Sequence, residues 1–335
     1  MSAKQHSISI HFACALLTAA KKHGLNQQSL LDAANLSSEL LVHPHVRITP
    51  IQLSQLMQAI WCAADDEYLC LGSQPSKHGI FSMMAKQVLE SINLRQVYRR
   101  GVHFYNLVTA ATSFRFQESN DCARFCIALT QPEKDQDHVL IDFLLLLWHR
   151  FPSWLIGQKI PLLRVGFCHP KPAHFEEYRL MFACDIYYGQ EENYLEFDKT
   201  CLNAAIVQTQ QSLSAYLRRC PLDWFQRQSY FDIYTRKVID ALEQSSDIKS
   251  VNMLHVASGL HMTTRTLRRK LLEEGTNFQQ LKDNIRRDIA IHYLSRPDMS
   301  IATIGQMLGF CEAGAFTRAF KNWTSMAPST YRKGQ

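Results

Sequence analysis

Apolar positions in the first ninety residues recur at helical spacing and are separated by residues that begin or end helices. Gly24 ends the first apolar segment as a common helix stop, and Asn26 is a good N-terminal cap for the next one. Pro50 opens a third segment, whose apolar residues fall on one face of a helix. Two further amphipathic stretches follow, 81–92 and 93–108. This part of the chain is therefore predicted to be helical.

The pattern changes to strand-like alternation near residue 112. Segments 113–119 and 123–129 alternate apolar and polar residues around the turn pair at 120–121, which predicts a hairpin. The remaining predicted elements of this part are an apolar helix at 138–150, a strand at 160–167, a short helix within 169–182, a second hairpin formed by 184–189 and 193–198, and an amphipathic helix at 200–219. Residues 1–225 are therefore predicted to form an α+β domain.

The predicted helix at 200–219 is the candidate contact between two copies of the chain. Its apolar side chains Leu202, Ile206, Leu213 and Leu217 fall near one stripe, and Arg218 and Arg219 close its end. A stripe of this kind serves equally well to pack a helix against its own domain. The sequence leaves both interpretations open.

A linker is predicted near 221–232, where Pro221 ends the preceding helix. Beyond it no strand pattern appears, and the periodicity is helical to the end of the chain. Residues 232–335 are therefore predicted to form an all-α domain. The fold class expected for the whole chain is an α+β domain followed by an all-α domain.

Two short predicted helices joined by a tight turn occupy residues 252–273. Their buried positions are expected to be Leu254, Val256 and Ala257 in the first helix and Leu267 and Leu271 in the second. The first helix ends near 259–261, and Thr263 is a good cap for the second. This is the pattern of a helix-turn-helix unit, whose second helix fits the major groove of DNA.

Three arginines lie opposite the buried leucines of that second helix: Arg265, Arg268 and Arg269. An arginine at such a position either donates two hydrogen bonds to guanine O6 and N7 or contacts a phosphate group. Cationic helix faces are more often simply solvated, so one such helix is weak evidence for DNA binding.

The same design recurs near the C-terminus. Ser300 is a cap for a helix that buries Ile304 and Leu308, and Gly309 provides the turn. The second helix of this copy is expected from about Glu312 to Trp323, with Phe316 and Phe320 inward and Thr317, Arg318 and Lys321 outward. Two such units in one domain are much stronger evidence than one.

A helix predicted at 277–294 joins the two units, with apolar residues Phe278, Leu281, Ile285 and Ile289 at helical period. About 18 residues at 1.5 Å each span roughly 27 Å. The two outer helices are therefore expected about one turn of DNA apart, ~34 Å, in two successive major grooves on one face of the duplex.

Positive charge is concentrated in the same region. Of the net charge of +6, residues 1–229 contribute +1, from 21 Lys and Arg against 20 Asp and Glu, and residues 230–335 contribute +5, from 15 against 10. A surface that attracts phosphates is therefore expected in the last third of the chain. The excess permits nucleic-acid binding without establishing it.

Other functions find less support. The ten cysteines include no CxxC pair, so we expect reduced thiols and neither a metal nor a cofactor. No nucleophile, base and orienting group form a readable catalytic motif, so an enzyme is not expected.

The longest apolar run, 139–148, contains Asp142 and has half the length of a bilayer span. The N-terminal apolar patch is interrupted by His11 and has no clear cleavage site. A cytoplasmic protein without membrane contact is expected.

Residues 250–332 resemble the DNA-binding domain of the AraC/XylS class of bacterial transcription regulators. The motifs that carry the resemblance are IGQMLGF at 304–310, AFTRAFKNW at 315–323 and PSTYR at 328–332. The resemblance implies a monomeric unit of seven helices with two helix-turn-helix elements on a rigid connecting helix. By that match the residues that face double-stranded DNA are Arg265, Arg268 and Arg269 in the first unit and Ala313, Gly314, Thr317 and Arg318 in the second. Thr263, Thr264 and Lys321 are expected as further DNA contacts.

The sequence departs from that class at three positions. His261 replaces a small turn residue, usually glycine, and Glu312 stands where Ser or Asp commonly caps a helix. Gly314 lowers helix propensity by up to ~1 kcal/mol and removes a side chain from the reading face. The second unit is therefore expected to contact phosphate more than bases.

Residues 1–225 more loosely resemble the effector-binding domain of the AraC subgroup that includes ornithine-utilisation regulators. The carriers are LRQVYRRGVHFYNLVT at 94–109, RVGFCHPKPAHFEEYRLMF at 164–182 and IYYGQEENYLEFD at 186–198. The resemblance implies a small-molecule effector, of unknown identity and with unknown pocket residues, and a homodimer.

Together these features predict a sequence-specific DNA-binding transcriptional regulator, an activator that responds to a small metabolite and has RNA polymerase as a further partner. One alternative is a DNA-binding regulator whose N-terminal domain only dimerises or binds a partner protein. A more remote alternative is a DNA-repair regulator with alkyl-transfer activity. That chemistry needs a nucleophilic cysteine in a compact metal-binding or Pro-Cys-His setting, and the sequence has no visible setting of this kind.

Overall fold

The computed structural model describes residues 7–182, 184–225, 233–245, 248–249, 251–273, 276–295, 299–310 and 312–333. Contacts divide the chain into two compact units, an α/β unit of residues 11–34 and 53–225 and a helical unit of residues 1–10, 35–52 and 226–335. The predicted linker is described only as far as Phe225. The predicted limits of the two domains stay predictions.

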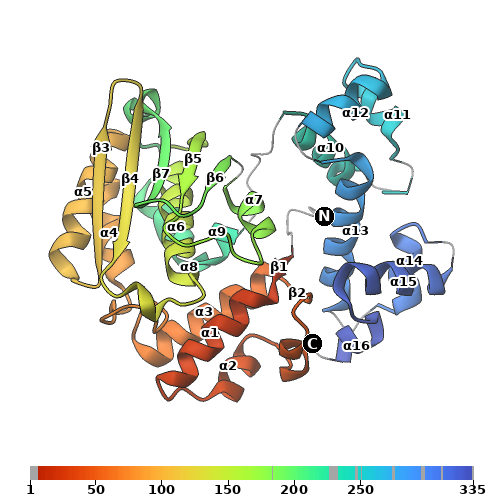
Figure 1. The fold of residues 1–335 in the computed structure, drawn as a ribbon, viewed down its shortest axis with the longest axis horizontal. Helices are drawn as coiled ribbons and strands as arrows, with labels where there is room; N and C mark the ends of the chain where they lie inside the picture. The colour runs from red at the N-terminus through yellow and green to blue at the C-terminus, as the bar shows by residue number, and fades with distance from the viewer. Residues whose placement is uncertain are drawn as a thin grey trace. The chain divides into compact units, whose positions relative to one another are not determined.

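The α/β unit is built on a mixed sheet (Figure 1). Its strands are β3 (Thr112–Glu118), β4 (Cys122–Leu129), β5 (Leu162–Gly166), β6 (Asp185–Tyr187) and β7 (Asn193–Asp198), in the order β3-β4-β7-β5-β6. Strands β3 and β4 pair antiparallel, with Phe114 opposite Ile127, which confirms the first predicted hairpin. Alternate residues of each strand point into the core, as the period of two requires.

The second predicted hairpin was wrong. Strands β6 and β7 do not pair with each other, because β5 lies between them. Strand β6 runs parallel to β5, and α7 (Glu176–Phe182) lies in the connection between the two. A parallel pair needs a long crossover of this kind, usually a helix, whereas β7 is antiparallel to both β4 and β5. The alternating pattern identified the strands but could not identify their partners.

Aromatic side chains fill the space between the sheet and two helices, α5 (Leu94–Val108) and α6 (Val139–Leu155). The ring of Trp148 on α6 lies 4.7 Å from that of Phe125 and 6.1 Å from that of Tyr98 on α5. Gly101 permits this packing, since a Cβ atom at that position would lie 2.2 Å from the Trp148 ring. The core of the unit therefore lies on the helix-covered face of the sheet.

Six more helices lie in the described residues of this part of the chain, and the helices near its N-terminus begin close to their predicted starts. They are α1 (Ile10–Lys22), α2 (Gln27–Ala33), α3 (Pro50–Ala64), α4 (Ile80–Leu89), α8 (Gln210–Arg219) and α9 (Leu222–Phe225), with 3-10 turns η2 (Pro132–Lys134) and η3 (Lys199–Asn203). The Asn26 side chain accepts a hydrogen bond of 3.0 Å from the Ser29 N–H and caps α2. Pro50 is the first residue of α3.

The predicted helix at 200–219 was also wrong, because α8 starts only at Gln210. Thr209 and Ser212 form a capping box at its start. Before it, the carbonyl of Ala204 accepts a hydrogen bond from the Leu94 N–H, and Ala205 pairs with Asn93, so this stretch is held extended against the start of α5. The predicted apolar stripe is therefore not one helical face, and two of its members, Leu202 and Leu213, are buried within the unit.

The C-terminal part of the helical unit is all helix, as predicted. Its described residues form α10 (Ile233–Gln244), α11 (Met253–Gly259), α12 (Thr264–Glu273), α13 (Phe278–Leu294), α14 (Ile301–Met307), α15 (Ala313–Thr324) and α16 (Pro328–Lys333), coloured from teal to dark blue in Figure 1. A buried apolar cluster joins α10, α11, α12 and α13, with Val238, Leu267 and Ile285 among its members.

Two N-terminal segments complete this unit. They contain the short strands β1 (Ile8–Ser9) and β2 (Arg47–Ile48), which pair antiparallel, and the 3-10 turn η1 (Ser38–Val42). The Ser7 hydroxyl donates a 2.6 Å hydrogen bond to Asp288 Oδ1 on α13, and Arg47 donates to the Ser7 hydroxyl and carbonyl oxygens at 2.8 and 2.6 Å. The Tyr331 hydroxyl on α16 donates to the Arg47 carbonyl at 2.6 Å. Residues from the two ends of the sequence thus share one buried polar network.

Candidate functional site

The first helix-turn-helix unit consists of α11 and α12. The Asn252 side chain caps α11 by accepting a 2.8 Å hydrogen bond from the His255 N–H. The inner face of α11 carries Met253, Val256, Ala257 and Leu260, at spacings of three and four residues. Leu254, predicted to be inward, is instead 64% exposed, because it lies one residue, about 100° around the helix, from the start of that stripe.

Helix α12 carries the predicted basic surface. The Thr263 hydroxyl accepts a 3.1 Å hydrogen bond from the Thr266 N–H, which confirms the predicted cap, and Leu267 and Leu271 are fully buried. The structure places the side chains of Arg265, Arg268 and Arg269 in solvent and leaves Thr264 half-buried. The outward face of α12 is therefore arginine-rich over a buried leucine face.

The second unit, α14 and α15, repeats this geometry. The Ser300 hydroxyl caps α14 by accepting a 3.0 Å hydrogen bond from the Thr303 N–H, as predicted. Helices α14 and α15 approach closely at Gly305, where a Cβ atom would lie 3.1 Å from Phe316 Cβ. Glu312 makes no side-chain cap hydrogen bond, in agreement with its weakness as a cap.

The predicted contact residues of α15 fall on its outer side where the structure describes them. Gly314, Arg318 and Lys321 are exposed, Thr317 is half-buried, and the side chain of Ala313 lies outside the described residues. One guanidinium nitrogen of Arg318 lies 3.5 Å from the position that a Cβ atom of Gly314 would occupy. The side chain of Arg318 therefore extends along the outer face towards the start of α15.

Helix α13 joins the two units. It has 17 residues, a length of roughly 25 Å, and Asn277 caps it by accepting a 2.9 Å hydrogen bond from the Gln280 N–H. Lys282 is buried, and its ammonium group donates to the Val251 and Lys249 carbonyls at 2.5 and 3.4 Å. This contact fixes α13 to the segment that leads into the first helix-turn-helix unit.

The turns of the two units match residue for residue. The Met262 N–H donates to the Ala257 carbonyl at 3.0 Å in the first, and the Phe310 N–H donates to the Gly305 carbonyl at 3.0 Å in the second. The residue before each donor has a positive φ, 55° at His261 and 89° at Gly309. Only glycine adopts this backbone conformation without a steric cost.

His261→Gly is therefore expected to stabilise the helical unit. A side chain in the left-handed region costs roughly 1 kcal/mol, and glycine removes that cost while keeping the turn. Urea denaturation of the full chain should show an increase of about 0.5–1 kcal/mol in the free energy of unfolding. Gly309→His is the matched reverse change and should lower it. A decrease in the free energy of unfolding of His261→Gly would contradict this prediction.

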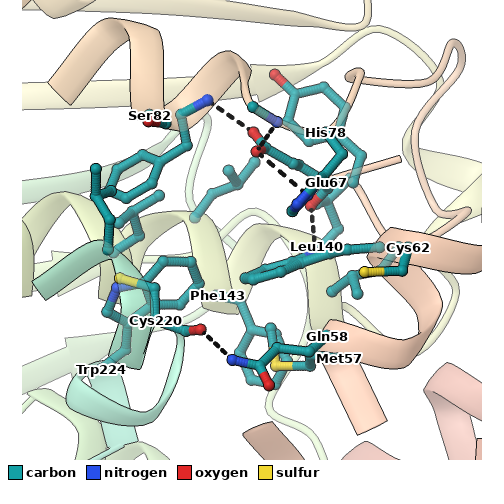
Figure 2. A pocket seen from close by; sticks show the side chains of 18 of the residues that line it. Met57, Gln58, Cys62, Glu67, His78, Ser82, Leu140, Phe143, Cys220 and Trp224 are labelled. Carbon is teal, nitrogen blue, oxygen red and sulfur yellow. Dashed lines mark hydrogen bonds and ion pairs between the residues drawn. The ribbon is translucent and has the colours of Figure 1, made fainter. Parts of the chain in front are cut away.

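A cavity of about 460 Å³ lies within the α/β unit (Figure 2). Aromatic and aliphatic side chains from α3, α4, α5, α6, α8 and α9, and from the loop between α3 and α4, form most of its wall. These are Met57, Trp61, Tyr68, Leu69, Phe81, Tyr105, Leu140, Phe143, Leu144, Leu147, Leu217 and Trp224. The lining residues with a polar or thiol group are Gln58, Cys62, Glu67, His78, Ser82, Arg218 and Cys220. An apolar cavity of this volume with a few polar groups is typical of a small-molecule site.

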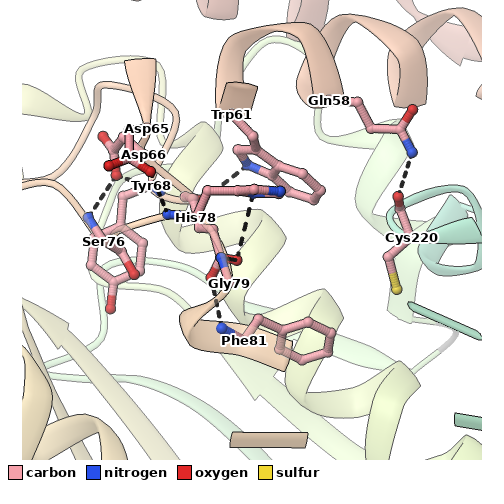
Figure 3. Close-up of polar contacts among 11 residues, drawn as sticks. Gln58, Trp61, Asp65, Asp66, Tyr68, Ser76, His78, Gly79, Phe81 and Cys220 are labelled. Atoms are coloured by element: carbon pink, nitrogen blue, oxygen red, sulfur yellow. Dashed lines mark hydrogen bonds and ion pairs between the residues drawn. The ribbon is translucent and has the colours of Figure 1, made fainter. Parts of the chain in front are cut away.

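One loop supplies the acidic part of the wall (Figure 3). The Asp66 carboxylate accepts hydrogen bonds from the Tyr68, Cys70 and Ser76 N–H groups at 2.7–2.9 Å and so fixes the loop. The two Glu67 oxygens accept from the N–H groups of Gly79 and Phe81 at 2.7 and 2.8 Å, at the N-terminus of α4.

The Glu67 carboxyl has an unusually high pKa. Burial raises its pKa to about 7, against the two backbone hydrogen bonds that lower it. His78 Nδ1 lies 3.8 Å from one of its oxygens, and the Trp61 indole N–H donates to the Glu67 carbonyl at 3.2 Å. A buried carboxyl with this pKa next to an aromatic wall is a candidate for ligand recognition.

No sequence motif marked the cavity, because its residues come from six helices and a loop. The run of three acidic residues at 65–67 after Trp61 was a signal that could have drawn attention to it. The described residues contain no group of three or more His, Cys, Asp or Glu side chains that could hold a metal, and their cysteines are free thiols. No helix in the described ranges is long and apolar enough to span a bilayer.

Comparison with known proteins agrees with this organisation. Residues 24–206 match the arabinose-binding N-terminal domain of AraC transcription regulators, and residues 256–334 match a helix-turn-helix domain. The ornithine utilization regulator of Pseudomonas aeruginosa is 28% identical over 339 residues, which cover 97% of this chain and 96% of that protein. The urease operon transcriptional activator of Escherichia coli is 38% identical over 77 residues, 23% of this chain and 26% of that protein.

Among solved structures, the transcriptional regulator CdpR from Pseudomonas aeruginosa is 21% identical, and the match covers 75% of this chain and 81% of that chain, with a TM-score of 0.30. The relatives above are transcription regulators, a class that acts by binding DNA and not by catalysis. The sequence match over more than half of the chain and the two helix-turn-helix units lead to one assignment: this chain belongs to the AraC family of DNA-binding transcription regulators.

Proposed function

We propose that this regulator reads DNA with α12 and α15 in two successive major grooves. The proposed contacts are Thr263, Thr264, Arg265, Arg268 and Arg269 from the first unit and Ala313, Gly314, Thr317, Arg318 and Lys321 from the second. The observation that carries the proposal is the repeated geometry of the two units on one capped helix, α13, with exposed arginines on the outward side of α12.

The two recognition helices differ in their proposed roles. Three arginines on α12 suit bidentate contacts to guanine, whereas Gly314 presents no side chain and Arg318 extends over it. Helix α15 then holds the domain on the DNA mainly through phosphates, by Arg318 and Lys321. Thr263 contributes through its backbone position, since its hydroxyl already caps α12.

Arg265→Ala and Arg268→Ala test the proposal. Each is expected to lower the affinity for the specific site by about 1–3 kcal/mol if the arginine contacts a base, with loss of discrimination at one position. A phosphate contact would instead give a uniform loss across sequences and a shallower salt dependence. Fluorescence anisotropy of the full chain with a selected operator, at several salt concentrations, separates the two.

Lys333→Ala is the control for that experiment, because it also removes one exposed positive charge, from the end of α16. It should leave specific binding nearly unchanged. Unchanged binding in both arginine variants would refute the placement of α12 in the major groove.

The proposal extends to sensing and assembly. The cavity of the α/β unit suits a small metabolite, which favours a sensor over a domain that only dimerises or binds a partner protein. We propose a homodimer that occupies two half-sites, so that complexes with paired half-sites contain two chains. In this scheme the regulator acts in the cytoplasm as an activator and contacts RNA polymerase.

A further inference from the structure

We propose that the cavity of the α/β unit is built for an organic monocation, an amine with an apolar or aromatic body, whose charged nitrogen lies at Glu67. This inference rests on the proposed function as a metabolite-responsive regulator and specifies the chemistry of its effector.

The shape of the cavity supports an apolar body. Aromatic rings line several sides of it, and the rings of Trp61, Phe81 and Trp224 lie within 6 Å of one another in two pairs, at 5.8 and 5.9 Å between centroids. Gln58 is already engaged, because its amide donates a 2.6 Å hydrogen bond to the Cys220 carbonyl (Figure 2). Most of the wall therefore offers ring faces and methylene groups, which bind apolar groups and attract cations through their π-electrons.

The electrostatics of the wall support a positive charge. Glu67 is the one carboxylate among the lining residues, and Asp65 and Asp66 precede it on the same loop. The hydrogen bonds that it accepts come from backbone N–H groups and not from a fixed cation. The nearest basic side chain, His78, is half-exposed and lies at 3.8 Å, beyond hydrogen-bond distance. An ammonium group brought to Glu67 would therefore supply the counter-charge that this acidic loop lacks.

The main competing feature is Arg218 on α8, the one arginine of the lining, which would favour an anion instead. Its side chain is exposed and therefore hydrated, whereas Glu67 is largely buried. Electrostatic attraction is stronger at the buried group, where water screens it less. The cavity thus favours a cation over an anion.

A further consequence concerns pH. Burial raises the pKa of Glu67 to about 7, so below that pH the carboxyl is mostly protonated in the empty cavity. An ammonium ion binds the ionised form, so its affinity should fall as the pH drops below 7 and level off above it. The charged groups that act on Glu67 are Asp65 and Asp66 on its own loop, and His78 lies 3.8 Å from it. Arg218 from α8 lines the same cavity.

The experiment uses three probes of the same shape: 4-phenylbutylamine, 4-phenylbutan-1-ol and 4-phenylbutanoate. Isothermal titration and thermal shift are measured on the full chain at pH 6 and pH 8. The amine is expected to bind at least about tenfold more tightly than the alcohol at pH 8, with a smaller advantage at pH 6. Preference for the carboxylate, equal binding of all three, or no binding of the amine would overturn the proposal.

Glu67→Gln should abolish the preference for the amine over the alcohol, and the exposed Glu133→Gln should retain it. Because Glu67 also caps α4, the first variant carries a risk of misfolding. Ser82→Phe avoids that risk, since it fills the cavity from a half-exposed position on α4. It should block the amine while the circular dichroism spectrum stays unchanged. Retained amine binding in Ser82→Phe would place the site elsewhere.

Operator binding distinguishes this inference from the proposed function. If the full chain binds a specific operator but the amine is not preferred, only the ligand assignment fails. If no specific DNA binding is found, the proposed DNA contacts fail, and the probe titrations still test the cavity by themselves.

Discussion

Ile285→Asp is expected to unfold the C-terminal helices and abolish DNA binding. Ile285 lies in the middle of α13 and is 2% exposed within the cluster that joins α10, α11, α12 and α13. The change removes an apolar side chain from a packed core and buries a carboxylate without a counter-charge. Together these are expected to cost at least about 4 kcal/mol, which is close to the whole stability of many domains. Both recognition helices are lost because α13 supports both.

Circular dichroism, urea denaturation and operator binding of the full chain measure this effect. Gln280→Asp is the matched control, because it adds the same carboxylate to an exposed position in the first turn of α13, where negative charge is favourable. It should leave the stability within about 0.5 kcal/mol of the original. A fully helical Ile285→Asp protein that still binds its operator would show that the inner face of α13 is assigned wrongly.

Asp288→Ala is expected to destabilise the helical unit by about 3 kcal/mol, although it lies outside both helix-turn-helix units. Asp288 is 5% exposed and accepts the 2.6 Å hydrogen bond from Ser7, whose hydroxyl also accepts from Arg47. Removal of the carboxylate leaves polar groups buried around it without their acceptor, which costs more than the hydrogen bond itself contributes.

A double-mutant cycle of Ser7→Ala and Asp288→Ala isolates this contact. Because the acceptor is charged, a coupling free energy of about 1.5–3 kcal/mol is expected between the two positions, which are 281 residues apart in sequence. Ser38→Ala, an exposed serine of the same unit, should not couple to Asp288. Additive effects of Ser7→Ala and Asp288→Ala would mean that the N-terminal segment does not pack against α13 in solution.

The sequence predicted best those features that depend on neighbouring residues. The caps at Asn26, Thr263 and Ser300 and the helices that they begin were confirmed, because a cap acts within three residues. The arginine face of α12 was visible for the same reason. Leu254 was misplaced because three candidate apolar residues in a helix of two turns leave more than one inner face open.

Features that depend on distant residues were not predictable from one sequence. Strands 185–187 and 193–198 were found, but their partners were not, because the pattern of a strand carries no information about which strand lies beside it. The helix at 200–219 was predicted to be too long, because the hydrogen bond from the Leu94 N–H to the Ala204 carbonyl overrides the local helix preference. The cavity was missed because Gln58, Glu67 and Arg218 come together only in the folded unit.

Because Ser7 and Asp288 lie far apart in the sequence, their contact can form only late in protein synthesis. A bacterial ribosome adds about 5–20 residues per second, so the 281 positions between the two residues correspond to roughly 14–56 s of translation. Throughout that time the segment that contains Ser7 has been synthesised but its acceptor does not yet exist. The α/β unit, which ends at residue 225, is complete before the helical unit can close around that segment. Products of premature termination before residue 288 therefore lack this closure, whatever the state of the domain that precedes it.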